Sequence, residues 1–246
     1  MDMKKLLAIS LVTISLSGCL DISKPFVIDF SRSDQGFEAI FSDYPVSDDF
    51  QNNEEFFELD SGHEPLPSPF QDESGWMLSG INRSDDLKMA IKGYRTGLLP
   101  NTAYDFKMSA EITTDIQSFC VGIGGAPGES VYFKLGASKR EPINRIEEPD
   151  AFPAYIVSID VGNQAQSGSQ GGVAGNVANG ITCGEENAVV KKTVTMESTV
   201  RVYTDFFGGF WIYAGTDSGF EGKTTYHINS ITTNISRASL SPKPAR

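Results

Sequence analysis

The chain has 246 residues, with 20 lysines and arginines against 32 aspartates and glutamates, a formal net charge of −12. A charge of that sign argues against a nucleic-acid partner, because binding phosphate needs a basic surface. It also argues against docking on anionic lipid through basic residues. Two histidines exclude a three-histidine metal site, three cysteines exclude a disulfide-dense scaffold, and 39% hydrophobic residues exclude a disordered chain.

The N-terminus has the features of a secretory signal. Lys4 and Lys5 precede an apolar run, residues 6–16, that is too short to span a bilayer as a helix. The run ends in Leu16-Ser17-Gly18-Cys19, which resembles the lipobox of bacterial lipoproteins. The resemblance implies cleavage after residue 18 and acyl chains, such as palmitate, on Cys19, and several chains on one residue anchor a protein stably. The alternative is an ordinary signal peptide with an incidental cysteine.

The residues after the signal indicate where the protein is held. Leu20, and not aspartate, follows Cys19, which by resemblance to Gram-negative sorting rules favours the outer membrane. Residues 19–25 form a short tether with a reach of roughly 20 Å. We therefore expect the folded domain to lie close to the membrane.

The body of the chain alternates apolar and polar residues, which is typical of strands with one buried face. Such runs begin at Leu87, Tyr104, Val131, Tyr155, Val200 and Phe210, and further strands are expected at 26–30, 37–42, 55–59 and 223–235. Residues 43–75, 138–153 and 162–188 are irregular, and no segment has the pattern of a capped amphipathic helix. The sequence predicts one all-β domain over residues 26–236, an antiparallel β-sandwich or jelly roll with long loops, and a disordered tail over 237–246.

One short motif supports the sandwich. Leu98-Leu99-Pro100-Asn101-Thr102-Ala103-Tyr104 resembles the corner of fibronectin type III and related modules, in which a tyrosine hydroxyl bonds back to the corner backbone. The match covers only seven residues, so it implies the architecture and not that family.

Four longer stretches resemble a group of bacterial secreted proteins and lipoproteins. They are residues 41–45 (FSDYP), 82–87 (NRSDDL), 124–132 (GGAPGESVY) and 215–222 (GTDSGFEG). The group has no established activity, so the resemblance implies no catalytic residue. Its domain is similar to jelly-roll carbohydrate-binding modules in architecture only, and a fold does not imply a function.

Acidic residues gather in the first third of the domain and offer a candidate metal site. Asp48-Asp49 and Asp85-Asp86 are the densest oxygen donors, and Ca²⁺ takes such ligands from loops. Asp85 and Asp86 are the candidate ligands for a structural calcium. The alternative, a solvated acidic face that aids solubility, is favoured because no EF-hand spacing is present.

The hairpin after residue 209 offers candidate ligand contacts. Trp211 and Tyr213 fall on the face opposite Phe210 and Ile212, so we expect them to form an exposed platform on which a sugar ring stacks. Asp217 and Glu221, in the turn that follows, add carboxylates that hold a sugar or a cation. The alternative is that the aromatic rings belong to the core and that Asp217 bonds local backbone.

Cys120 and Cys183 remain as a pair once Cys19 is acylated. In an oxidising envelope an even pair favours a disulfide, which would attach the glycine-rich 162–188 loop to residues near 117–123. The alternative is two buried free thiols.

Three functions stay open at this point. We favour a lipid-anchored, outer-membrane protein that binds a glycan without catalysing a reaction. The first alternative is a glycoside hydrolase or lyase that uses loop carboxylates such as Glu58, Asp60 and Glu64, which requires two carboxylates in one cleft. The second alternative is a structural or adhesive envelope protein. Ser218 is not expected to be a nucleophile, because neither histidine has a recognisable context as its base.

Overall fold

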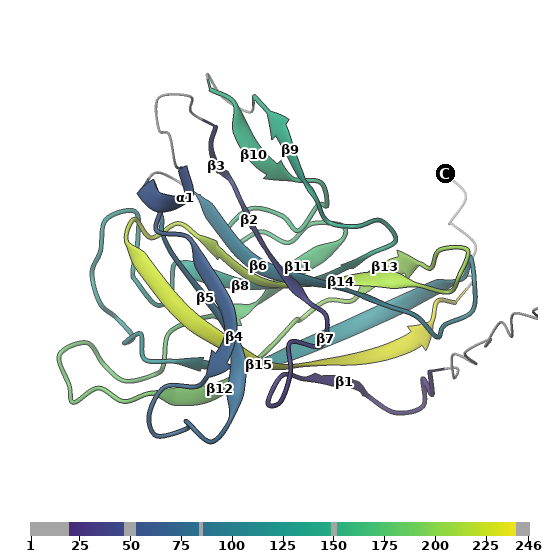
Figure 1. The fold of residues 1–246 in the computed structure, drawn as a ribbon, viewed down its shortest axis with the longest axis horizontal. Helices are drawn as coiled ribbons and strands as arrows, with labels where there is room; N and C mark the ends of the chain where they lie inside the picture. Colours follow the sequence, from purple (N-terminus) through teal and green to yellow (C-terminus); the bar gives the residue numbers. More distant parts are fainter. Residues whose placement is uncertain (1–19, 47–52, 84–85, 149–151, 240–246) are drawn as a thin grey trace, which may run out of the picture.

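A computed structural model describes residues 20–46, 53–83, 86–148 and 152–239. Figure 1 shows a sandwich of antiparallel sheets with a small third sheet projecting from one face. The predicted all-β sandwich is therefore confirmed. Among the described residues, no helix is long and apolar enough to cross a membrane.

The larger sheet, sheet A, has the path β12-β7-β15-β5-β4, with β1 paired to β15 and β13 paired to β7. Its strands are β1 (Phe26–Asp29), β4 (Asp60–Pro65), β5 (Ser74–Ile81), β7 (Ala103–Thr114), β12 (Val190–Thr195), β13 (Val200–Tyr203) and β15 (Lys223–Arg237). Strand β15 runs to Arg237, one residue beyond the predicted end of the domain.

The second sheet, sheet B, has the order β11-β8-β14-β6-β2. Its strands are β2 (Glu38–Ser42), β6 (Leu87–Arg95), β8 (Val131–Ser138), β11 (Gly171–Asn176) and β14 (Phe210–Ser218). The small sheet has the order β3-β10-β9 and consists of β3 (Tyr44–Pro45), β9 (Asn144–Glu147) and β10 (Ala154–Val157).

The core lies between sheets A and B, and its pattern follows from the alternation in the sequence. On β7, the side chains of Tyr104, Phe106, Met108 and Ala110 are buried while Lys107 is exposed, as the period of two predicts. The inward face of β14 is likewise Phe210, Ile212 and Ala214.

The corner before β7 also forms as predicted. The backbone N–H of Leu99 donates a hydrogen bond to the hydroxyl of Tyr104 over 3.1 Å. Asn101 takes a positive φ of 49° in the turn between them, which asparagine tolerates well.

Three local expectations were wrong. Residues 55–59 do not form a strand: a single helical turn, α1 (Asn53–Phe56), ends there and β4 begins at Asp60. The three stretches expected to be irregular contain strands: β3 and β4 lie in 43–75, β9 in 138–153 and β11 in 162–188. These strands lack a strong apolar alternation, since β9 is exposed and β11 is rich in glycine. The strand at Tyr155 ends at Val157, and the chain after it crosses the outer face of sheet B.

Candidate functional site

The outer face of sheet B is the surface on which the sequence places its ligand contacts. Trp211, Tyr213 and Asp217 do share this face, opposite Phe210 and Ile212. The face is not open to solvent along its length, however. Residues 157–170, called here the cover segment, cross it and place Val157, Ile159 and Val161 against Ile40, Ala90 and Tyr213 in a second small hydrophobic cluster.

The cover segment lies very close to the sheet. At its end the segment joins the sheet, where the backbone N–H of Ala137 donates to the carbonyl of Gln170 over 2.9 Å and extends the β8–β11 ladder. A Cβ at Gly136 would lie 2.7 Å from that same carbonyl oxygen, so the strand needs glycine where the segment crosses it. Sheet B is therefore buried on both faces at this point.

This arrangement corrects two predicted contacts. The side chain of Tyr213 is only 1% exposed and that of Asp217 is 0% exposed, so neither reaches a ligand in solvent. Glu221 is partly buried in the turn after β14, where its backbone N–H donates to the carbonyl of Ile123. Trp211 and Asp217 are six residues apart on one strand, roughly 20 Å, so the four predicted contacts do not converge.

Asp217 belongs instead to a buried charge network beneath the cover segment. Its Oδ2 lies 3.3 Å from the ammonium of Lys88 and 3.8 Å from that of Lys134, and it accepts the backbone N–H of Gln164 over 2.7 Å. Lys88 also pairs with Asp43. Lys134 donates to the carbonyl of Gln166 over 2.6 Å, which ties the sheet to the cover segment.

Burial shifts the pKa of each of these groups toward the neutral form, and the neighbouring charges of opposite sign oppose that shift. It raises the pKa of Asp217 and of Asp43, because a charged carboxylate loses its hydration there. Burial would lower the pKa of Lys88, but the carboxylates of Asp217 and Asp43 raise it overall. Lys134 has weaker compensation, and burial lowers its pKa to about 8.

The network is not fully satisfied within the described residues. Asp217 Oδ1, Asp43 Oδ1 and the hydroxyl of Tyr213 have no hydrogen-bond partner there. Because these atoms are sealed under the cover segment, the network serves to hold that segment and does not present a surface for a large ligand.

An accessible pocket lies at the edge of the cover segment. It has a volume of about 530 Å³, within the range of small-ligand sites. Its lining consists of Lys139, Arg140, Glu141, Ile143, Arg145, Ser158, Ile159 and Gln170. Three of these eight residues are cationic and one is anionic, although the whole chain carries a net charge of −12. Composition alone did not reveal this local excess of positive charge.

The anion in the pocket lining has its own partner. Glu141 Oε1 lies 2.6 Å from the ammonium of Lys92, which also contacts Glu38 at 3.1 Å. Within the described part of the chain, Arg140 and Arg145 have no carboxylate partner of this kind. The pocket therefore retains two guanidinium groups for a ligand.

Trp211 does not line this pocket, but it contacts Lys92, whose ammonium pairs with Glu141 of the lining. The ammonium of Lys92 lies 5.6 Å from the centre of the Trp211 ring, and the centre of the Tyr94 ring lies 5.4 Å from it. Trp211 is partly exposed, unlike Tyr213. Of the four predicted contacts it is the one that stands next to an open pocket.

A second pocket, on sheet A, is lined by several carboxylates, which is the arrangement that the hydrolase alternative requires. It has a volume of about 260 Å³, and Asp29, Glu73 and Glu111 line it. Each carboxylate is already engaged: Asp29 accepts the N–H of Ser31, Glu73 pairs with Lys191, and Glu111 accepts the amide of Asn229.

The other carboxylates considered for hydrolysis also serve structural contacts. Glu58 pairs with Lys223 at 2.9 Å and Glu64 with His227 at 3.3 Å, while Asp60 accepts the backbone N–H of Ser61. Ser218 is 1% exposed and its hydroxyl donates to the carbonyl of Phe220.

The calcium prediction falls only partly within the structure. Asp48, Asp49 and Asp85 lie outside the described residues. Asp86 Oδ1 accepts a hydrogen bond from the side-chain amide of Gln164 over 2.7 Å. The negative charge of Asp86 also acts to raise the pKa of the two buried lysines, Lys88 and Lys134. In the described ranges no three acidic, histidine or cysteine side chains gather as a metal site, and calcium stays a prediction.

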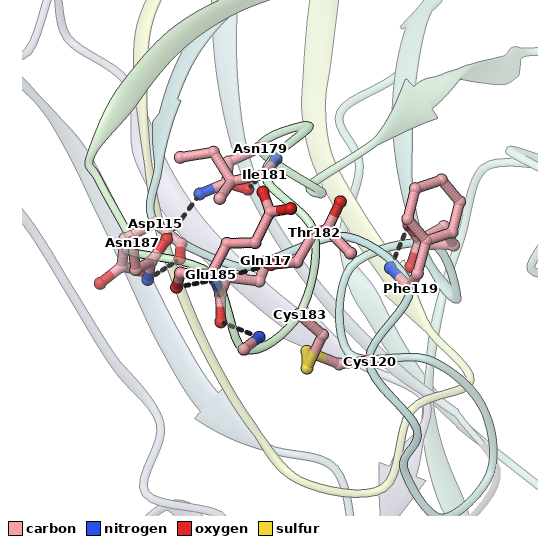
Figure 2. The surroundings of a disulfide bond; sticks show 12 residues. Asp115, Gln117, Phe119, Cys120, Asn179, Ile181, Thr182, Cys183, Glu185 and Asn187 are labelled. Carbon is pink, nitrogen blue, oxygen red and sulfur yellow. Dashed lines mark hydrogen bonds between the residues drawn. A yellow bond between two sulfur atoms is a disulfide. The ribbon is translucent and has the colours of Figure 1, made fainter.

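The cysteine pair is joined. Cys120 and Cys183, 63 residues apart, form a disulfide that connects the loop after β7 to the loop after β11 (Figure 2). The side chain of Gln117 reinforces the connection by donating to the carbonyls of Thr182 and Glu185. Cys19, the predicted site of acylation, lies outside the described residues.

Comparison with known proteins does not assign the chain to a family. No protein-family model matches the chain, and no curated protein matches it. Solved structures that it resembles include the CBM22-1 xylan-binding domain from Paenibacillus barcinonensis, at 10% identity over 87% of this chain and 95% of that chain, with a TM-score of 0.36. A candidate sugar-binding protein from Bacteroides thetaiotaomicron matches at 10% identity over 85% and 92%, with a TM-score of 0.37.

A third solved structure is more distant still. The N-terminal cellulose-binding domain of β-1,4-glucanase C from Cellulomonas fimi matches at 12% identity over 85% of this chain and 93% of that chain, with a TM-score of 0.22. At these TM-scores the likenesses carry no inference about a ligand or a site in this chain.

Proposed function

We propose that this chain is a lipoprotein of the outer membrane whose β-sandwich binds an acidic glycan without catalysing a reaction. The observation that carries the choice of ligand is the basic pocket. A chain with a net charge of −12 places Lys139, Arg140 and Arg145 around one cavity of about 530 Å³.

The chemistry of the pocket suits a sugar carboxylate. A guanidinium group binds a carboxylate through two parallel hydrogen bonds, and such charge-assisted bonds are about twice as strong as neutral ones. Ser158 and Gln170 add polar groups of the kind that contact sugar hydroxyls, and Ile143 and Ile159 add an apolar wall. Trp211, partly exposed, adds apolar surface near the pocket, and its ring is held by Lys92 and Tyr94.

The anchoring part of the proposal is supported by the lipobox resemblance at Leu16-Ser17-Gly18-Cys19 and by Leu20 after it. Metabolic labelling with an alkyne fatty acid tests this part directly. The full chain is expected to incorporate the label, and a Cys19→Ala variant is expected to lose it. Equal labelling of the two proteins would contradict acylation at Cys19.

Binding is tested with the soluble domain, residues 20–246, on immobilised polysaccharides. Polygalacturonate and alginate are expected to retain the protein, whereas neutral xylan and cellulose retain it weakly. A double variant, Arg140→Ala with Arg145→Ala, is expected to lose at least tenfold in affinity, because each lost charge-assisted hydrogen bond is worth about 1.5–3 kcal/mol.

The matched control is Lys223→Ala, which removes an exposed cation that pairs with Glu58 and does not line the pocket. It is expected to bind like the wild type. Failure to bind any acidic polysaccharide, or an equal loss in the control, would overturn the proposed site.

A further inference from the structure

The loop between β13 in sheet A and β14 in sheet B exposes two large aromatic side chains at its tip. Phe206 is 74% exposed and Phe207 is 76% exposed. Their rings contact each other with centres 5.5 Å apart. Exposing two adjacent phenylalanines to water is unfavourable, so the pair indicates a surface that is covered in use.

The tip is built to hold these rings outward. The carboxylate of Asp205 accepts the backbone N–H groups of Phe207 and Gly209 and the hydroxyl of Tyr94, over 2.6–2.8 Å. Gly208 has a positive φ of 74°, and a Cβ there would lie 1.9 Å from the carbonyl oxygen of Leu98. The loop therefore has one well-defined shape, and its conformation does not depend on burying the phenylalanines.

Two neighbouring residues extend the apolar surface. Leu99 is 45% exposed, and its carbonyl accepts the hydroxyl of Thr204 over 2.6 Å, which places it against the same loop. Tyr203, at the end of β13, is 58% exposed. We call Leu99, Tyr203, Phe206 and Phe207 the hydrophobic tip.

The start of the described chain lies beside the hydrophobic tip. The backbone N–H of Leu20 donates to the carbonyl of Gly97 over 2.8 Å, and the N–H of Leu98 donates to the carbonyl of Gly208 over 3.2 Å. Since Gly97 and Leu98 share a peptide bond, Leu20 N and Gly208 O are at most about 8 Å apart. Cys19 is bonded directly to Leu20, so an acyl chain on it would enter the bilayer next to the tip.

We propose that the hydrophobic tip inserts into the phospholipid surface that holds the acyl chains of Cys19. The proposal rests on the proposed acylation, and it adds a second contact with the membrane. Aromatic rings are favoured at the boundary between headgroups and acyl chains, and two attachments restrict the orientation of a domain where one does not.

The insertion fixes which end of the sandwich faces outward. Strand β7 begins beside the tip and ends at the 115–130 loop, about 37 Å away along the strand. In Figure 1 the start of β7, β13 and the end of β15 lie on one side of the sandwich. The loop that carries Ile123, 72% exposed, is therefore held away from the membrane.

The test uses the full acylated chain in vesicles of phosphatidylethanolamine and phosphatidylglycerol. A Phe206→Cys variant is labelled with a polarity-sensitive fluorophore, and the native Cys120 and Cys183 do not react because they form a disulfide. The control is Ile123→Cys, an exposed apolar position at the opposite end. The expected result is a blue shift and quenching by brominated acyl chains for position 206, and neither effect for position 123.

Flotation of the same vesicles and the mass of the protein distinguish a failure of the acyl anchor from a failure of the tip to insert. Acylated, floating protein without a blue shift or quenching at position 206 overturns insertion of the tip and leaves the anchor standing. Protein without acyl chains overturns the anchor and, with it, the insertion. Equal quenching at positions 206 and 123 would show that the domain has no fixed orientation, which also overturns the insertion.

Discussion

Asp217 balances two buried cations, and this role explains why a carboxylate lies on β14 with no exposure to solvent. Its Oδ2 faces Lys88 and Lys134, and both ammonium groups are buried with it. Removing one member of such a group leaves the others charged and without compensation, which costs more than the group itself contributes to stability.

We therefore expect Asp217→Asn to lower the free energy of unfolding by about 3–5 kcal/mol. Urea denaturation followed by tryptophan fluorescence measures this. Glu58→Gln is the matched control, because it breaks a half-exposed pair with Lys223 and should lower the stability far less than Asp217→Asn does. Equal effects of the two variants would show that the buried network contributes little.

Lys134 predicts a dependence of stability on pH. Burial lowers its pKa from 10.5 to about 8 in the folded protein, so the folded state releases this proton at lower pH than the unfolded state does. Between these two values the unfolded chain binds more protons, and the free energy of unfolding rises with pH through this group. Below about pH 8 both states are protonated and the cost of burying the charge is constant.

The measurement compares the wild type with Lys134→Met, in which this titration is absent. From about pH 8 to pH 10.5 the wild type is expected to gain about 1–3 kcal/mol relative to the variant. Chemical denaturation at each pH gives the difference, and the contribution of other groups cancels. Parallel pH profiles would contradict a lowered pKa for Lys134.

At the scale of elements, the two long loops at the end of β7 and β11 depend on each other. Neither has regular structure apart from an isolated parallel bridge between Ser118 and Thr182. The disulfide between Cys120 and Cys183 and the hydrogen bonds of Gln117 join them into one unit (Figure 2).

Replacing both cysteines by alanine is expected to cost about 4 kcal/mol of unfolding free energy, because the bridge closes a loop of 63 residues. Hydrogen exchange should show a faster local opening of residues 115–130 and 177–187, in addition to the lower protection of the core that follows from the lower global stability. Reduction of the wild type by dithiothreitol should reproduce the effect. An unchanged stability would mean that the hydrogen bonds of these loops suffice without the bridge.

The whole molecule combines a strong negative charge with a local basic pocket. At long range a polyanion is repelled by the net charge of −12, because the few cations of the pocket contribute little to the electrostatic potential there. Raising the salt concentration shortens the range of this repulsion to about 8 Å at physiological ionic strength, while contacts inside the pocket are screened less.

The association rate of polygalacturonate should therefore rise by a factor of a few as sodium chloride increases from about 0.01 to 0.15 M. Surface plasmon resonance with the soluble domain measures it. Arg140→Ala with Arg145→Ala should retain this trend while dissociating faster. A rate that falls with salt would show that the local positive field, and not the net charge, governs the approach of the ligand.

Much of the fold could be predicted because the relevant information is local in the chain. Alternation identified β7, β8 and β14 and their inward faces, and the seven-residue corner identified the bond to the Tyr104 hydroxyl. The pair of cysteines that remains once Cys19 is set aside suggested the bridge. These features depend on side-chain period, on turn chemistry and on the number of thiols, all of which a sequence states directly.

The position of the candidate site was decided only by the tertiary structure. Alternation places Tyr213 and Asp217 on the outer face of sheet B, but it does not state whether another segment covers that face. The cover segment, more than forty residues away in the chain, buries both side chains and leaves Trp211 at the margin. The same crossing brings Ser158, Ile159 and Gln170 next to Arg140 and Arg145, and so creates a basic pocket that the net charge of the chain conceals. The sequence by itself determined which residues point to the same side of a strand; burial and proximity across long separations depend on packing, which no local pattern specifies.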